Sequence, residues 1–102
     1  MQNPRFLKRI LGLEEFEQLK ERGLQAQSVA GNFCAKEALS KALGTGIKGF
    51  TFTDAQVLRD RQGKPYFVLS DLAAQKAEGY SIEVSITHTK EYASAVVLIS
   101  DH

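Results

Sequence analysis

The sequence predicts an α+β fold in which a mostly antiparallel sheet packs on a central helix. Residues 28–43 wind into a helix whose apolar side chains cover nearly the whole circumference, so we expect neighbours on several of its sides. Ile82, Val84 and Ile86 alternate with polar residues, which is typical of a strand with one apolar face. The turn sequence of residues 60–63 separates two short apolar runs and predicts a hairpin.

Each further element is predicted by a local pattern of apolar residues and of capping or stop residues. Ser28 is expected to cap the central helix, and Gly44 to end it. Phe50 and Phe52 alternate with threonines, so we assign them to a strand. In chain order, helices are expected over residues 13–22, 28–43 and 71–78, and strands over residues 50–58, 65–69, 82–86 and 92–99.

The composition describes one ordinary globular domain over residues 1–102, with 43% apolar and 25% charged residues. A net charge of +1 gives no basic field of the kind that marks nucleic-acid coats. The single cysteine, Cys34, excludes an internal disulfide and fits a reducing compartment. No apolar run approaches the ~20 residues that span a bilayer, and the first residues lack the apolar core of a signal peptide. We therefore expect a cytoplasmic protein without a membrane partner.

The charges of the central helix allow two interpretations. Glu37 and Lys41 share one sector of the helix at i and i+4, whereas Lys36 points about a quarter turn away. They could form a structural ion pair, or they could hold a divalent cation and a phosphate oxygen together. The Gly-Thr-Gly turn of residues 44–46 allows close backbone approach to a phosphate, but it is equally suited to end a helix. Periodicity leaves both interpretations open.

A second polar group, residues 85–92, surrounds His88. A histidine at a strand end, amid hydroxyls and near Lys90, suits contact with an anion, although an isolated histidine near a turn is more often an ordinary surface residue. The sequence contains neither an HExxH pattern nor a cluster of cysteines and histidines, which makes a zinc site improbable.

Three blocks of the sequence together resemble holo-acyl-carrier-protein synthase, the small bacterial class of 4′-phosphopantetheinyl transferases. The blocks are FCAKEALSKALGTGI at residues 33–47, GKPYF at 63–67 and VSITHTKEYASAVVLI at 84–99, with RFLKRIL at 5–11 as a further match. The resemblance implies the 4′-phosphopantetheinyl transferase fold and transfer of phosphopantetheine from coenzyme A to a serine of apo-acyl carrier protein in fatty acid biosynthesis. It also implies a homotrimer with active sites between subunits, and docking of the acidic carrier protein at Arg5 and Arg9.

Carried over position by position, the resemblance assigns the site residues. Glu37 would be the Mg²⁺ ligand, and Lys41 would contact the coenzyme A phosphate and assist departure of 3′,5′-ADP. His88 and Thr89 would meet the 3′-phosphoadenosine end of the coenzyme. The remaining lining of the coenzyme A pocket would be Ser40, Gly44, Thr45, Gly46, Lys64 and Pro65.

The chain departs from the family pattern at two places. Members carry a Gly-Ile-(Gly)-x-Asp-Ile strand and a helix before the RFLKRIL segment, whereas this sequence starts at Met1, so the aspartate that is the second metal ligand is not found. Asn32 stands where relatives often carry arginine. We therefore expect a weakened metal site. The alternative function is a catalytically impaired form that binds coenzyme A or carrier protein. A nucleic-acid-binding domain finds little support in a near-neutral chain.

Overall fold

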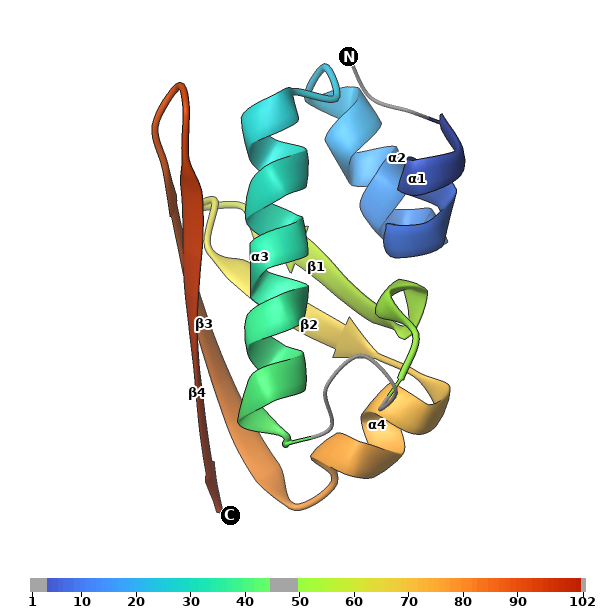
Figure 1. The fold of residues 1–102 in the computed structure, drawn as a ribbon, viewed down its shortest axis with the longest axis vertical. Coiled ribbons are helices and arrows are strands. Elements are labelled where there is room, and N and C mark those ends of the chain that lie inside the picture. The colour runs from blue at the N-terminus through green and yellow to red at the C-terminus, as the bar shows by residue number, and fades with distance from the viewer. Residues whose placement is uncertain (1–3, 45–49, 102) are drawn as a thin grey trace.

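The computed structural model describes residues 4–44 and 50–101. Its elements in chain order are α1 Pro4–Ile10, α2 Leu13–Glu21, α3 Ala26–Ala42, the 3-10 helix η2 Phe52–Asp54, β1 Ala55–Arg59, β2 Pro65–Leu69, α4 Asp71–Ala77, β3 Tyr80–His88 and β4 Ala93–Asp101. The long central helix, α3, has neighbours on opposite sides (Figure 1). The ribbon of β3 and β4 covers one side of α3. Helices α1 and α2 cover the other side of its first half, and the β1–β2 hairpin crosses behind it. This arrangement confirms that the central helix is packed on several sides.

The observed elements confirm an α+β fold with antiparallel pairing. Strand β1 pairs with β2 and β3 pairs with β4, both antiparallel, so the described strands form two two-stranded sheets rather than one.

Two local predictions were wrong. Helix α3 begins at Ala26 with the extended residue Gln25 as its N-cap, so Ser28 lies inside the first turn, where its N–H donates to the Gln25 carbonyl. Phe52 is part of η2 and not of a strand, because Thr51 closes a turn: its carbonyl accepts from the Asp54 N–H at 3.0 Å and its hydroxyl donates to the Asp54 carboxylate at 2.8 Å. Phe50, also outside any strand, is buried beneath α3.

Helix α1 was not predicted, although the sequence contains its signals. Pro4 occupies the first helical position, where no N–H is needed, and Lys8 and Arg9 lie in the last turn, where they complement the helix dipole. Leu7 and Ile10, at i and i+3, are its buried residues.

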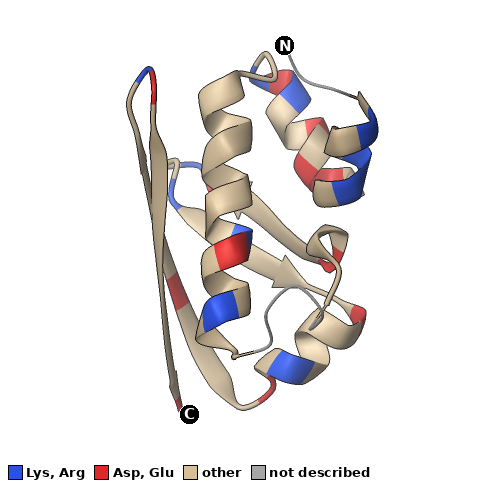
Figure 2. Cartoon of the chain, viewed as in Figure 1, with Lys and Arg blue, Asp and Glu red and all other residues tan. Residues whose placement is uncertain are grey.

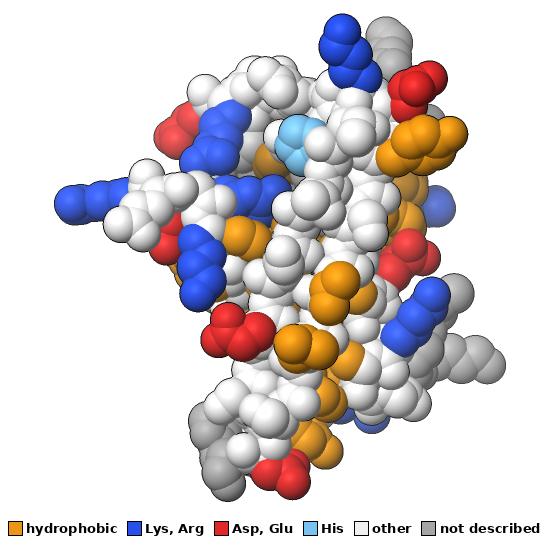
Figure 3. Space-filling view, turned by 90° about the vertical axis from the view of Figure 1, so that its left-hand side faces the viewer, with side chains coloured by type: hydrophobic (Ala, Val, Ile, Leu, Met, Phe, Trp, Pro, Cys, Tyr) orange, Lys and Arg blue, Asp and Glu red, His pale blue; other side chains and the backbone are white. Residues whose placement is uncertain are grey.

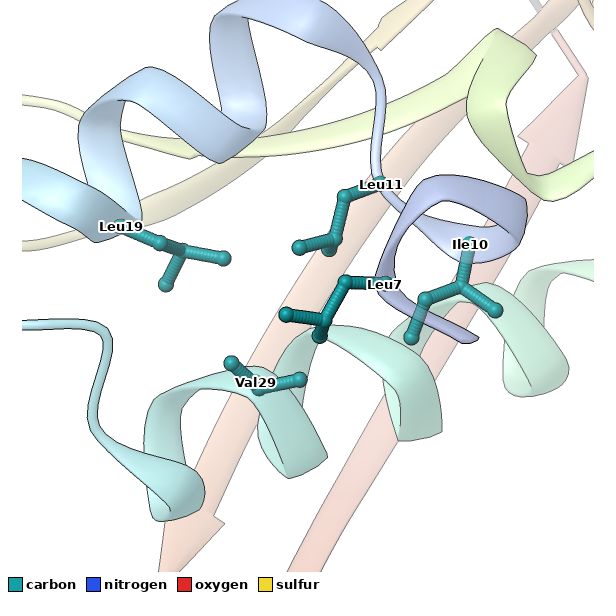
Figure 4. Packing of buried hydrophobic residues seen from close by; sticks show 5 residues of the cluster. All are labelled: Leu7, Ile10, Leu11, Leu19 and Val29. Carbon is teal, nitrogen blue, oxygen red and sulfur yellow. The ribbon is translucent and has the colours of Figure 1, made fainter. Parts of the chain in front are cut away.

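Most of the buried apolar residues form two clusters, one at each half of α3. Figure 4 shows the first cluster, in which side chains from α1, the α1–α2 link, α2 and α3 converge: Leu7, Ile10, Leu11, Leu19 and Val29. Leu39, Phe50, Ala55 and Ala73 form the second cluster, beside the C-terminal half of α3. Full burial of a leucine or valine contributes about 1.5–3 kcal/mol, so both halves of the helix are anchored.

A glycine brings α3 close to the β3–β4 ribbon. A Cβ atom added at Gly31 would lie 2.8 Å from the Ile86 side chain, closer than carbon atoms approach. The missing side chain therefore allows the helix to lie directly on β3. None of the helices that the structure describes is both long and apolar enough to cross a membrane.

Candidate active site

Glu37 and Lys41 are both exposed on α3. Figure 2 shows acidic and basic residues together in the lower half of this helix. Glu37 and Lys41 do not pair with each other. The ion pairs among the described residues are Lys36 with Glu15 and Lys64 with Glu83. The structural ion pair between Glu37 and Lys41 is therefore not formed, which leaves both groups facing solvent.

The charge that α3 buries is Lys36, whose side chain is 0% exposed. Its Nζ donates to Glu15 Oε1, to the Phe52 carbonyl and to the Ala55 carbonyl, each at 2.7 Å. An ammonium group has three N–H donors, so all of them are satisfied. Burial lowers the pKa of Lys36, whereas attraction to the Glu15 carboxylate and their hydrogen bond oppose that effect.

Glu15 is the centre of this buried network and is also 0% exposed. Its Oε1 accepts from Lys36 and from the Gly12 N–H at 3.1 Å, and its Oε2 accepts from the Val57 N–H at 3.2 Å and from Asn32 Nδ2 at 3.0 Å. One carboxylate thus joins α2, α3 and β1. Such a group is stable in the core only because each oxygen has two donors.

Asn32 completes the network. Its Nδ2 also donates to the Val57 carbonyl at 3.2 Å, whereas its Oδ1, although buried, has no hydrogen-bond partner among the described residues. Asn32 is 1% exposed, so this residue contributes to the core.

The other predicted coenzyme contacts are spread along the chain. Ser40 is buried on α3, and Gly44 follows the helix with a positive φ of 72°, as a helix stop requires. Thr45 and Gly46 lie outside the described residues. At the β1–β2 hairpin, Lys64 Nζ lies 3.7 Å from Glu83 Oε1 in an exposed pair, and the neighbouring Pro65 is half-buried.

His88 and Thr89 lie at the far end of β3, and both are exposed. The Thr89 hydroxyl accepts from the Tyr92 N–H at 3.1 Å, which closes the β3–β4 turn. This turn lines a small cavity together with Ala30 in the first part of α3. At 1.5 Å per residue, Lys41 lies roughly 16 Å further along the helix axis than Ala30. Thr89 and Lys41 are therefore well separated within one chain.

Comparison with known families decides what this arrangement belongs to. A sequence model described as the 4′-phosphopantetheinyl transferase superfamily matches residues 1–97. The chain belongs to this superfamily.

Its curated relatives in the superfamily are holo-acyl-carrier-protein synthases. The Fusobacterium nucleatum protein is 43% identical over 98 residues, which cover 92% of this chain and 80% of that relative. The Bacillus subtilis protein is 44% identical over 98 residues, which cover 93% of this chain and 77% of that relative. Among solved structures, Helicobacter pylori holo-acyl-carrier-protein synthase in complex with coenzyme A is 35% identical, with a TM-score of 0.81 over 94% of this chain and 82% of that one. The Neisseria meningitidis synthase has a TM-score of 0.87 at 31% identity, and the match covers 97% of this chain and 82% of that one.

The donor set of this transferase-family chain allows a limited metal site. Among the described residues, no three histidine, cysteine, aspartate or glutamate side chains come together to hold an ion. Glu37 supplies one exposed carboxylate. Mg²⁺ typically takes one or two carboxylates and completes its shell with water and substrate phosphates. A magnesium ion held mainly by the substrate would need only one such carboxylate from the protein, and the exposed Glu37 fits that requirement.

The buried network is the part of the site region that sequence reasoning missed. Glu15 belongs to the run of acidic residues in the first half of α2, which looks like a solvated face. Its position on the helix indicates burial, because Glu15 lies one turn before the buried Leu19 and next to the half-buried Phe16.

Cys34 reports on the charge of Glu37. Burial, and then the negative charge of Glu37, raises the pKa of the Cys34 thiol. Glu37→Gln removes the second cause, so the pKa falls and the thiolate fraction at pH 8 rises. We expect alkylation of Cys34 by iodoacetamide to accelerate about twofold or more, as followed by mass spectrometry. Glu17→Gln, an exposed change on α2, should leave the rate unchanged; equal rates in all three proteins would contradict the electrostatic coupling.

Proposed function

We propose that this chain transfers 4′-phosphopantetheine from coenzyme A to a serine of apo-acyl carrier protein and releases 3′,5′-ADP. This is the cytoplasmic step that activates carriers for fatty acid biosynthesis. The observation that carries the proposal is that Glu37 and Lys41 are exposed on α3 and have no ion pair within residues 4–44 and 50–101, in a chain that matches the transferase family over nearly its whole length. Coenzyme A complexes among the related solved structures support the substrate.

The chemistry requires little more of the protein than positioning and charge neutralisation. The serine oxygen of the carrier forms a bond to phosphorus, its proton passes to water or to a carboxylate in reach, and the bond to 3′,5′-ADP breaks. Lys41 neutralises negative charge on the phosphate as that bond breaks. Glu37 would hold Mg²⁺, which supplies Lewis-acid polarisation of the phosphate oxygens when bound. Lys64, His88 and Thr89 are the candidates for contacts with the rest of the coenzyme.

Helix α1 is the proposed docking site for the carrier protein. Its exposed Arg5 and Arg9 offer positive charge to an acidic partner. Residues of α1, of α2 and of the link between them line a groove of about 790 Å³, whose walls include the apolar Leu7 and Phe16 and the basic Lys8. A basic residue at an apolar groove suits an acidic, amphipathic surface.

A homotrimer with its sites between subunits would bring separated groups together. Thr89 and Lys41 lie apart on one chain, whereas Thr89 of a neighbouring copy could lie close to Lys41. The outer face of the β3–β4 ribbon, opposite α3, exposes Val96 at 57% and Leu98 at 66%. Figure 3 shows hydrophobic side chains gathered on this face. An apolar patch on a sheet face is a suitable surface for contact between copies.

The trimer is tested by the double change Val96→Asp and Leu98→Asp. Two carboxylates on the patch should separate the copies, because buried unpaired charge opposes association. Light scattering should give about three times 11.3 kDa for the unchanged chain and 11.3 kDa for the variant. Gln75→Asp on α4 is the control and should remain trimeric. A wild-type mass of one chain would contradict the assembly.

The transferase activity is tested with coenzyme A that carries a fluorophore on its thiol. Apo-acyl carrier protein should become fluorescent in a denaturing gel when enzyme and Mg²⁺ are present. A carrier whose acceptor serine is replaced by alanine should remain dark. Binding of coenzyme A by calorimetry without any labelled carrier would instead favour the catalytically impaired form.

A further inference from the structure

We propose that the buried Glu15–Lys36 pair is a positioning device that fixes the rotation of α3, so that Glu37 and Lys41 face the ligand. The inference rests on the proposed function of Glu37 and Lys41 and adds a cause for their placement. Neither Glu15 nor Lys36 can itself touch a substrate, because both side chains are 0% exposed.

Apolar packing alone leaves the rotation of α3 poorly defined. Its small apolar side chains are distributed around the helix, so that Ala30 is exposed whereas Val29, Ala35 and Leu39 are buried. A helix of this kind can bury similar apolar area after turning about its axis. A directional contact is needed to select one rotation, and a buried polar group in an apolar interface can supply it.

Lys36 makes that directional contact to three separate elements. Its Nζ is held at 2.7 Å by Glu15 on α2, by the Phe52 carbonyl of η2 and by the Ala55 carbonyl that begins β1. Asn32, one turn earlier on α3, donates to the same carboxylate at 3.0 Å and to the Val57 carbonyl at 3.2 Å. Two residues of α3 are thus attached to the same point of the core.

The position of Lys36 determines where Glu37 and Lys41 point. Successive residues of a helix differ by about 100° in direction, so Glu37 projects about 100° from Lys36, and Lys41 about 140° from it. With Lys36 held in the core, both groups are directed to solvent, as observed. Loss of the attachment would let the ammonium of Lys36 move toward water and turn Glu37 and Lys41 with it.

The test compares Glu15→Asp and Glu15→Gln with Leu19→Ala. Glu15→Asp keeps the charge but withdraws the carboxylate, so it should remain folded and draw Lys36 out of place. Glu15→Gln removes the anion. Leu19→Ala destabilises the first apolar cluster without touching the network. Steady-state transfer is measured at a temperature where circular dichroism shows each protein folded, and lysine exposure is measured by acetic anhydride labelling and peptide mass spectrometry.

We expect Glu15→Asp to lower kcat at least tenfold with KM for coenzyme A within threefold, whereas Leu19→Ala keeps kcat within twofold. Acetylation of Lys36, relative to the exposed Lys76, should rise at least fivefold in Glu15→Gln and remain unchanged in Leu19→Ala. Wild-type kcat in both Glu15 variants, or kcat losses no larger than that of Leu19→Ala, would overturn the positioning role. So would a Lys36 that stays unreactive in Glu15→Gln. If Lys36 becomes reactive but the unchanged chain transfers nothing, the attachment of α3 is supported and the proposed function fails instead.

Discussion

Replacing Glu15 by glutamine is expected to lower the free energy of unfolding by about 3–5 kcal/mol, because the change leaves the Lys36 ammonium buried without its anion. The pair is fully buried at 2.7 Å, so water cannot replace the lost partner. Small domains unfold with about 5–15 kcal/mol, so this one change removes a large share of the total. Urea denaturation followed by circular dichroism measures the difference.

The Lys64–Glu83 pair offers a matched control for this prediction. Its atoms lie 3.7 Å apart, and the side chains are 64% and 73% exposed. Exposed pairs contribute about 0–1 kcal/mol, so Glu83→Gln should leave the urea midpoint almost unchanged. Equal effects of Glu15→Gln and Glu83→Gln would show that burial does not set the strength of the Glu15–Lys36 pair.

Replacing Glu37 by alanine is expected to reduce transfer by about 10²–10³-fold, because the described residues offer no group of acidic side chains that could take over the metal. The fold should be unaffected, since Glu37 is exposed and has no ion pair among the described residues. Lys41→Ala should also reduce the rate, by removing positive charge at the phosphate. The exposed Glu78 of the α4 C-cap gives the control, because Glu78→Ala changes an equally exposed carboxylate away from α3. Initial rates from fluorescent coenzyme A transfer measure all three variants.

Local patterns predicted most of the fold. Strand β2 matches its predicted bounds, α4 begins at Asp71 as predicted, and Gly44 ends α3 with a positive φ. These features depend on a few neighbouring residues, so the sequence contains them. Ser28 was misassigned because Gln25, three residues earlier, takes the N-cap position of α3. Phe52 was misassigned because Thr51 and Asp54 close a turn around it, and its carbonyl also accepts from Lys36, sixteen residues earlier in the chain.

The site was predictable only in part, because some of its contacts join residues that are far apart in the sequence. The i and i+4 spacing places Glu37 and Lys41 on one sector of α3, and the structure exposes both. The spacing could not show which lysine of the helix is buried, because that depends on Glu15 and on carbonyls of η2 and β1. Pairing across 21 residues has no periodic signature, so the spacing gave Lys36 a direction but no partner.

The most direct test of the account is the intact mass of apo-acyl carrier protein after incubation with this chain, coenzyme A and Mg²⁺. We predict that the carrier gains the mass of one phosphopantetheine group and that 3′,5′-ADP appears in equal amount. With Glu37→Ala at the same concentration, the carrier should stay in its apo form over the same time. A carrier that remains unmodified at high concentrations of the unchanged chain, or one that is modified equally fast by Glu37→Ala, would contradict the account.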